Sequence, residues 1–407
     1  MNKLLLLLVS LVVVLCVAGQ VDASSATQTK PSSQSPPPPK EPPPAPPTAS
    51  DELAHTQKEE KDSGQQAALL ADVSVSSRSF NPSKGEETGV YYSLSRTAQV
   101  EVAFYDPDFA LVRRFASDAL QEPGKHAVVW DGKDLDGTIV PDEAYFFTIA
   151  AKDEEGKKEV YDPSAFSGGE GADVTEAHID PYTKVITYKL PEMARVLIRL
   201  GVQDGPLLKT LVDWKPRVAG AITEHWNGKD EDNVIDLLDH PRFKMLVTYF
   251  ALPEHSIITY GNKDMDYRRY KGSLKAARPV KERPDRADVM LSPHYQLPRT
   301  VDYSPRLALS FSDIKDKEKG DIPVLKDKTL VKIDIDDENR SFFINQQYEI
   351  TLFLDTEFYT EQEIGYIPFN WVWDLSDVPA GEHVLTVNLS GFKDQIGVIS
   401  KRIKVAE

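Results

Sequence analysis

VVWDGKDLDG (Val128–Gly137) is the stretch that decides the fold of this chain, because it occurs twice. Ninety-six residues later stands EHWNGKDEDN (Glu224–Asn233), and the same spacing holds far upstream of both copies. The pairs that it relates are Val90/Ile186, Tyr92/Tyr188, Leu94/Leu190, Val100/Val196, Val102/Ile198, Gly124/Gly220, Trp130/Trp226 and Lys133/Lys229. An ungapped match over about forty residues is an internal repeat, and a repeat of this length indicates a duplicated domain.

Apolar and polar residues alternate around the motif in the first repeat. Val100, Val102 and Phe104 are separated by polar or small residues, which is the period of two expected for a half-buried strand. Turn residues recur every eight to twelve positions, a pattern typical of a β-sandwich. The other strands expected here are 90–94, 111–115, 126–130 and 145–149. We therefore expect an all-β fold.

Each part of the repeated motif has a structural explanation. The tryptophan should fill the centre between two sheets. The Asp or Asn after it can accept a hydrogen bond from the backbone N–H two residues on, and the glycine supplies the backbone freedom that the turn needs. These positions are Trp130, Asp131 and Gly132 in the first copy and Trp226, Asn227 and Gly228 in the second.

The whole pattern resembles the FlgD-type Ig-like domain, a module named for the flagellar hook-capping protein and common in exported bacterial proteins. The residues that carry the resemblance are Val-x-Val-x-Phe-Tyr-Asp, Gly-x-His, Trp-Asp-Gly-x-Asp-x-x-Gly and Tyr-x-Phe-x-Ile, over residues 67–153 and, with losses, 173–260. The second copy replaces the closing Gly137 by Asn233, which also tolerates positive φ, and inserts residues 236–242. The hook-capping protein itself is not implied, because its own N-terminal region is absent.

The resemblance implies tandem Ig-like β-sandwiches. A weaker echo, Trp373-Asp374, predicts a third Ig-like sandwich of another subtype, with strands at 329–335, 348–354, 369–373, 384–389 and 397–405. The expected organisation is a signal peptide at 1–23, a proline-rich disordered linker at 24–66, the two copies at 67–163 and 164–262, a basic connector at 263–297 and the third sandwich at 298–407.

The N-terminus predicts export. The apolar run Leu4–Ala18 has about fifteen residues, short of the ~20 that span a bilayer and typical of a cleaved signal peptide; an uncleaved anchor is the alternative. Ten of the seventeen residues of Pro31–Pro47 are proline, which favours a semi-rigid polyproline II spacer. Cys16, the only cysteine, lies inside the apolar run, so we expect a mature chain without disulfides, Cys-ligated metal or a membrane span.

The search for chemistry yields no expected catalytic residue, metal or cofactor. No zinc-protease, nucleophile-elbow or phosphate-loop motif occurs in the chain, and we expect no enzyme. Asp131, Asp134 and Asp136 could be imagined as calcium ligands, but their order departs from the EF-hand series and turn-capping is the better interpretation. A net charge of −17 argues against nucleic acid as a partner.

Two surfaces could bind a partner. The connector carries eight Lys or Arg between residues 267 and 286; it either packs on acidic faces of its neighbours or contacts an acidic partner through Arg268, Arg269, Lys271 and Lys275. A second group of aromatic residues either packs between domains or forms an exposed face for carbohydrate: Trp214, Trp371, Phe358 and Tyr359.

The sequence therefore predicts a non-catalytic structural or adaptor protein that binds another envelope or surface protein in the periplasm, at the outer membrane or outside the cell. A polysaccharide-binding module is the alternative. The exposure of the tryptophans would separate the two hypotheses.

Overall fold

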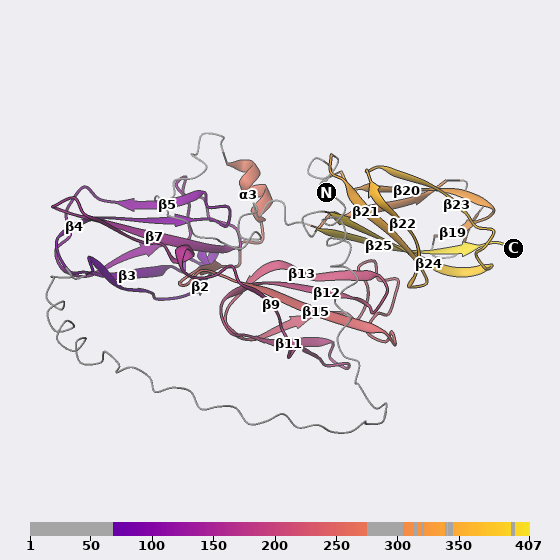
Figure 1. Cartoon of the computed structure of the whole chain (residues 1–407), viewed down its shortest axis with the longest axis horizontal. Coiled ribbons are helices and arrows are strands. Elements are labelled where there is room, and N and C mark those ends of the chain that lie inside the picture. Colours follow the sequence, from indigo (N-terminus) through magenta and orange to yellow (C-terminus); the bar gives the residue numbers. More distant parts are fainter. Residues whose placement is uncertain are drawn as a thin grey trace, which may run out of the picture. The chain divides into compact units, whose positions relative to one another are not determined.

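The computed structural model describes residues 68–274, 304–312, 314, 316–318, 321–337, 340, 345–391 and 395–407. Within these ranges the chain is all-β, as predicted, and forms three β-sandwiches (Figure 1). Short helical segments accompany the strands: the α-helix α3 (Tyr267–Ser273) and the 3-10 helices η2 (Pro82–Lys84) and η3 (Pro163–Ala165). The predicted signal peptide, the proline-rich linker and most of the basic connector lie outside the described residues.

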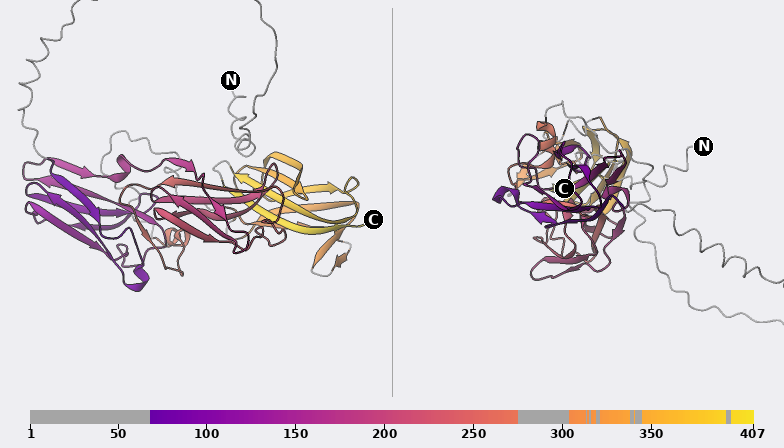
Figure 2. Two further views of the ribbon diagram at one scale, coloured as in Figure 1. Left: turned by 90° about the horizontal axis from the view of Figure 1, so that it is seen from below. Right: turned by 90° about the vertical axis from the view of Figure 1, so that its left-hand side faces the viewer.

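Nine strands form the first sandwich. Their bounds are β1 Leu70–Val75, β2 Ser79–Phe80, β3 Thr88–Leu94, β4 Ala98–Tyr105, β5 Leu111–Ala116, β6 Gly124–Trp130, β7 Ala144–Asp153, β8 Lys158–Tyr161 and β16 Ile257–Thr259. One sheet has the order β1-β3-β6, and the other has the order β2-β16-β7-β4-β5 with β8 beside β7. Figure 2 shows these indigo and purple strands from two further sides.

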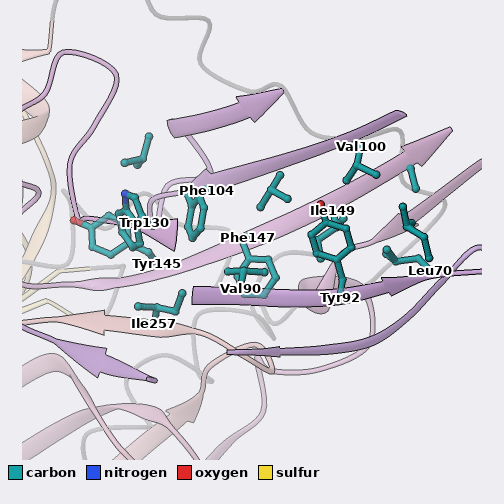
Figure 3. Close-up of a cluster of buried hydrophobic side chains, with 14 of the residues drawn as sticks. Leu70, Val90, Tyr92, Val100, Phe104, Trp130, Tyr145, Phe147, Ile149 and Ile257 are labelled. Atoms are coloured by element: carbon teal, nitrogen blue, oxygen red, sulfur yellow. The ribbon is translucent and has the colours of Figure 1, made fainter. Parts of the chain in front are cut away.

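Side chains from both sheets meet in one apolar core (Figure 3). Val90 on β3 and Phe147 on β7 face each other and are fully buried. Trp130, at the end of β6, is also fully buried and stacks on Phe104 with ring centroids 4.6 Å apart. The alternate residues that the sequence placed on one face are therefore the inward-facing ones.

The second sandwich has a similar plan. Its strands are β9 Gly171–Asp173, β10 His178–Ile179, β11 Val185–Leu190, β12 Ala194–Val202, β13 Leu207–Arg217, β14 Gly220–His225 and β15 Phe243–Ala251. The sheets have the orders β10-β11-β14 and β13-β12-β15-β9. Strand registers recur between the two sandwiches, in the cross-strand pairs Val90–Val128 with Ile186–Glu224 and Val102–Ile149 with Ile198–Val247.

The third sandwich follows residue 304. Its strands are β17 Leu307–Phe311, β18 Asp316–Glu318, β19 Ile322–Leu325, β20 Lys328–Ile335, β21 Tyr348–Leu354, β22 Glu357–Gly365, β23 Phe369–Asp374, β24 Gly381–Gly391 and β25 Ile396–Val405. The sheets have the orders β17-β20-β23 and β18-β19-β25-β24-β21-β22. All five strands expected from the sequence are present, as β20, β21, β23, β24 and β25, and the other four, β17, β18, β19 and β22, were not predicted.

One strand departs from the expected domain boundaries. β16 lies within residues 164–262, which were assigned to the second copy, yet it joins the first sandwich. It pairs antiparallel with β7 and parallel with β2, and Ile257 is part of the first apolar core. By the spacing of 98 residues that follows the insertion, β16 corresponds to β8 of the first repeat. The last strand of the second repeat thus pairs in a sheet of the first sandwich.

Candidate functional site

The repeated loop has the same hydrogen bonds in both copies. The indole Nε1 of Trp130 donates to the Lys133 carbonyl at 3.0 Å, and Trp226 does the same to Lys229 at 2.8 Å. The oxygen Oδ1 of Asp131 accepts from the Lys133 backbone N–H at 3.1 Å, which closes the turn as expected. The equivalent bond from Lys229 to Asn227 measures 3.0 Å.

Two glycines make this turn geometry accessible. Gly132 and Gly228 have φ values of 70° and 85°, in the left-handed region that favours glycine. Asn233, which replaces the closing Gly137, has φ 59°, so the tolerance expected of Asn is used here. The motif residues singled out in the sequence are therefore structural elements of the loop.

A buried carboxylate organises each loop from within. Asp134 is 1 % exposed, and its Oδ1 accepts hydrogen bonds from the backbone of Asp136 and Thr138 at 2.9 and 3.0 Å. Asp230, ninety-six residues later, is fully buried and accepts from the next turn in the same way. These bonds give Asp134 the turn-capping role preferred over calcium ligation. Within the described residues no three His, Cys, Asp or Glu side chains are grouped to hold a metal.

Helix α3 docks on the first loop. The second carboxylate oxygen of Asp134, Oδ2, accepts a hydrogen bond from the Tyr270 hydroxyl at 3.0 Å. Tyr270 is 1 % exposed, so its hydrogen bond to Asp134 is shielded from solvent, whereas the tip of the loop at residues 135–138 is exposed. The side chain of Asp266 caps the start of the helix by accepting from the Arg269 backbone N–H.

Lys271 holds the same helix to the first sandwich through an acidic turn. Its Nζ lies 2.8 Å from Oδ2 of Asp106 and 3.2 Å from Oδ2 of Asp108. Burial raises the pKa of Asp106, and Lys271 opposes that shift. Burial lowers the pKa of Lys271, but the two carboxylates outweigh it and the pKa is raised overall, so the ammonium stays charged.

The other connector residues differ in their surroundings. Arg269 is exposed and lies 3.7 Å from Asp266, Arg268 is half-buried, and Lys275 lies outside the described residues. Lys271 therefore follows the interpretation in which the connector packs on an acidic face of a neighbouring domain. The expectation of an outward-facing contact through Lys271 is replaced by this internal ion pair.

A buried ion pair joins the first sandwich to the second. Arg195 on β12 contacts Glu143, the residue before β7, with 2.6 Å between Nη2 and Oε1, and both side chains are at most 8 % exposed. Arg195 also donates to the Trp214 carbonyl at 3.2 Å, and Glu143 accepts from the Ala144 backbone N–H. Trp214 is buried and its ring lies 5.0 Å from that of Phe250, between ring centroids, so it does not form an exposed face.

The second loop contacts the third sandwich. Oδ2 of Asp232 accepts a hydrogen bond from the Ser400 backbone N–H at 2.6 Å, and Arg402 donates to the Val234 carbonyl at 2.9 Å. Asp232 occupies the position ninety-six residues after Asp136. Burial raises the pKa of Asp232.

An amide pair strengthens this second joint. Leu207 donates its backbone N–H to Oδ1 of Asn388 at 2.9 Å, and Nδ2 of Asn388 returns a bond to the Leu207 carbonyl at 2.8 Å. The loop after the tryptophan thus contacts helix α3 in the first repeat and the third sandwich in the second repeat.

The third sandwich uses its Trp-Asp unit differently. Trp373 is buried, but its Nε1 donates to the Tyr359 hydroxyl at 2.9 Å instead of to a backbone carbonyl three residues on. Oδ1 of Asp374 accepts from the Ser376 backbone N–H, as a turn-closing Asp does. Trp373-Asp374 therefore shares with the repeated motif the hydrogen bond that closes the turn, but not the bond from the indole to a backbone carbonyl of the loop.

An aromatic surface that binds carbohydrate would need exposed tryptophan rings. Four of the five tryptophans are buried, and Trp371 is half-buried, stacked on Trp373 at 5.2 Å between ring centroids. Of the remaining aromatic candidates, Tyr359 is half-buried and only Phe358 is well exposed, at 56 %. No tryptophan strip is open to solvent.

Comparison with known proteins assigns the first repeat. Residues 77–155 match the family model of the FlgD Ig-like domain, so this segment is an FlgD Ig-like domain, and further β-sandwiches follow it. The family match does not extend to the second repeat. No curated protein matches the chain.

Several solved structures are similar to parts of this chain. FlgD from P. aeruginosa is 24 % identical over 22 % of this chain and 66 % of its own, with a TM-score of 0.19. An endo-β-1,4-mannanase from Thermotoga petrophila is 18 % identical over 25 % of this chain and 20 % of its own, with a TM-score of 0.18. A bacterial ice-binding adhesin is 10 % identical over 84 % of this chain and 99 % of its own, with a TM-score of 0.17.

Because these TM-scores are low, the family assignment rests on the match of residues 77–155 alone. The chain spans less than two thirds of the hook-capping protein and one fifth of the mannanase. Among the helices of the described residues, none has the length and apolar content to cross a membrane.

Proposed function

We propose that this chain is an exported, non-catalytic structural protein of the bacterial envelope or surface, an adaptor whose Ig-like modules present a binding surface to another envelope protein. The observation that carries the proposal is the use of the repeated loops. Loops at the ends of sandwiches are where such folds usually place recognition, because insertions there leave the core intact. Here the first loop contacts helix α3 and the second loop contacts the third sandwich, so both loops hold later parts of the same chain.

The second sandwich is, in this proposal, a diverged second copy of the FlgD Ig-like domain. The recurring strand registers and the two matching indole bonds support it. The second copy differs from the first mainly in two features: the insertion at residues 236–242, and the pairing of β16 with the first sandwich. A duplicated module with fixed joints suits a spacer or platform better than a catalytic domain.

The partner proposed is a protein. The net charge of −17 disfavours nucleic acid, and the burial of four of the five tryptophans favours a protein partner over a polysaccharide. We propose no cofactor and no catalytic residue for this chain.

Binding to envelope material tests the adaptor role. The mature chain, immobilised, should retain an envelope component in a saturable way, and protease treatment of the extract should abolish retention. Retention that survives the protease but is lost after periodate oxidation of glycans would instead establish the polysaccharide-binding alternative. N-terminal sequencing of the protein outside the cytoplasm tests export, with a mature terminus expected near Gln20 or Ser24; an intact Met1 would contradict it.

A further inference from the structure

One lateral side of the third sandwich leaves the edges of two strands open. β22 is the terminal strand of the six-stranded sheet and, within the described residues, pairs only with β21. β23 is the terminal strand of the facing sheet and pairs only with β20 there. Tyr359 on β22 packs against Trp371 and Trp373 on β23, so the two edges lie on the same side (Figure 1).

Large apolar side chains are exposed along this side. Phe358 is 56 % exposed, Ile364 48 %, Tyr366 55 % and Val372 63 %. Single exposed apolar residues need no explanation, but four within fifteen residues on adjoining edge strands indicate a contact surface.

The open edge is also strongly acidic. Between Tyr348 and Tyr366 there are five acidic residues and no Lys or Arg. Arg242 of the second sandwich pairs with Glu357. In the described parts of the chain no ion pair supplies Glu361 or Glu363 with a cation.

The acidic side chains gather on one face of the sheet. Burial raises the pKa of Glu349 on β21, and the neighbouring charges of Glu361 and Glu363 raise it further. A cation brought to this face would relieve that repulsion.

The chain itself shows how an open edge can be filled. β16 adds to the edge of β7 through backbone pairing, with Ile257 opposite Tyr145. Main-chain hydrogen bonds of this kind supply affinity, and alternate side chains supply specificity.

We propose that the open edge of β22 binds an extended segment of the partner protein in which Lys or Arg alternates with apolar residues, adding it to the sheet as a further strand. The cations of that segment face Glu361 and Glu363 on the outer face of the sheet, and its apolar residues face Tyr359 and Trp371 on the inner face. The proposal rests on the adaptor function and names the chemistry of its partner.

A second copy of this chain fits the edge poorly. Two β22 strands paired with each other would bring Glu361 and Glu363 of one copy against the same acidic strand of the other, and like charges facing each other across strands are destabilising. The charge pattern thus favours a partner of opposite sign over self-association.

Fluorescence anisotropy with designed peptides tests the proposal on the mature chain. The probes are acetyl-Lys-Val-Lys-Val-Lys-Val-Lys-amide, its counterpart with Glu in place of Lys, and a third with Pro in place of Val. The Lys-Val peptide should bind at least about tenfold more tightly than the Glu-Val peptide. The Lys-Pro peptide should lose this binding, because proline cannot pair along a strand.

A charge-reversed protein provides the matched comparison. The double variant E361K/E363K should reverse the preference toward the Glu-Val peptide, whereas E154K/E155K, the same change at exposed positions of the first sandwich, should leave it unaltered. Equal binding of Lys-Val and Lys-Pro peptides, or an unchanged preference in E361K/E363K, would overturn the proposal.

Retention of the envelope partner separates this inference from the adaptor function. If E361K/E363K retains the partner as well as the wild-type protein does, the docking surface is wrong and the adaptor function stands. If the peptide preference reverses but no envelope protein is retained, the surface stands and the adaptor function is wrong.

Discussion

The tryptophan of the repeated motif links the apolar core to the loop that follows it, which in the first repeat contacts helix α3. Trp130 stacks on Phe104 and meets Tyr145 edge to face at 5.3 Å, while its indole N–H holds the loop backbone at Lys133. One side chain therefore performs both a packing and a hydrogen-bonding role. Its loss should be felt in the core and in the joint together.

Replacing Trp130 by Ala should lower the free energy of unfolding by about 3–5 kcal/mol, because a fully buried ring is removed and a cavity is left. Urea unfolding measures the change. The matched control is Trp371→Ala, whose half-buried ring should cost less. An unchanged melting temperature in the Trp130 variant would show that the core assignment is wrong.

His383 makes the third sandwich more stable in mild acid. Burial lowers its pKa, but the bond from Nδ1 to Asp355, 2.6 Å long, and the contact with the Pro379 carbonyl outweigh burial and raise it overall. A raised pKa gives stability that is fully present below about pH 6.5, the ordinary histidine value, and is lost as pH rises through the folded pKa.

The variant His383→Asn should therefore lose stability relative to wild type at pH 5.5 and differ less from it at pH 8. Urea unfolding at the two pH values measures both differences. A gap between the two proteins that widens toward pH 8 would contradict the assignment.

Local signals predicted much of the loop but not its contacts. The Asp after the tryptophan, the glycine and the Asn at positive φ follow from turn chemistry and were foreseen. The contact of Asp134 with helix α3 was not, because its partner Tyr270 lies 136 residues away. The recurrence of Asp134 as Asp230 in the repeat was the available signal.

At the scale of elements, β16 shows that the alternation of apolar and polar residues cannot predict which sheet a strand joins. Its apolar residues identify a strand, and the repeat identifies it as the counterpart of β8. Which sheet edge a short strand joins depends on tertiary packing, and here β9 occupies the edge of β15 whereas β16 pairs with β7. The boundary expected from the sequence, 164–262, therefore assigned these residues to the wrong sandwich.

The buried pair of Glu143 and Arg195 fixes β7 of the first sandwich against β12 of the second. Arg195→Met should cost about 3–5 kcal/mol, because it leaves a buried carboxylate without its cation. The double variant Glu143→Leu with Arg195→Met should recover most of this loss, since both buried charges are then absent.

The exposed pair of Lys133 and Asp131 serves as the control, where Lys133→Met should cost less than about 1 kcal/mol. Chemical unfolding of the three variants completes the comparison. A double variant no more stable than Arg195→Met would place the energy of the joint elsewhere.

At the scale of the whole described chain, tandem sandwiches were predictable and their coupling was not. Composition, periodicity and the repeat indicated three all-β modules. The joints depend on single long-range contacts, such as those of Asn388 with Leu207, that leave no periodic trace. Fold class follows from many weak local signals, whereas a joint depends on a few residues distant in sequence.

β16 follows the second sandwich in the chain but pairs in a sheet of the first. Unfolding the second sandwich should therefore remove a strand from the first, which makes the two sandwiches one cooperative unit. Differential scanning calorimetry should therefore show a single transition for both. Gly261, which follows β16, has φ 94°, and a Cβ there would lie 2.2 Å from Nδ2 of Asn81. Gly261→Val should displace the strand and split the transition into two, with the first sandwich melting at the lower temperature.

Gly85→Val is the matched control for backbone strain. Its φ of 76° is also in the left-handed region, but a Cβ there meets no atom within 4 Å. It should lower the melting temperature of the joint transition without splitting it, because β16 keeps its place. Two separate transitions in the wild-type protein, or equal splitting by both variants, would show that β16 does not couple the sandwiches.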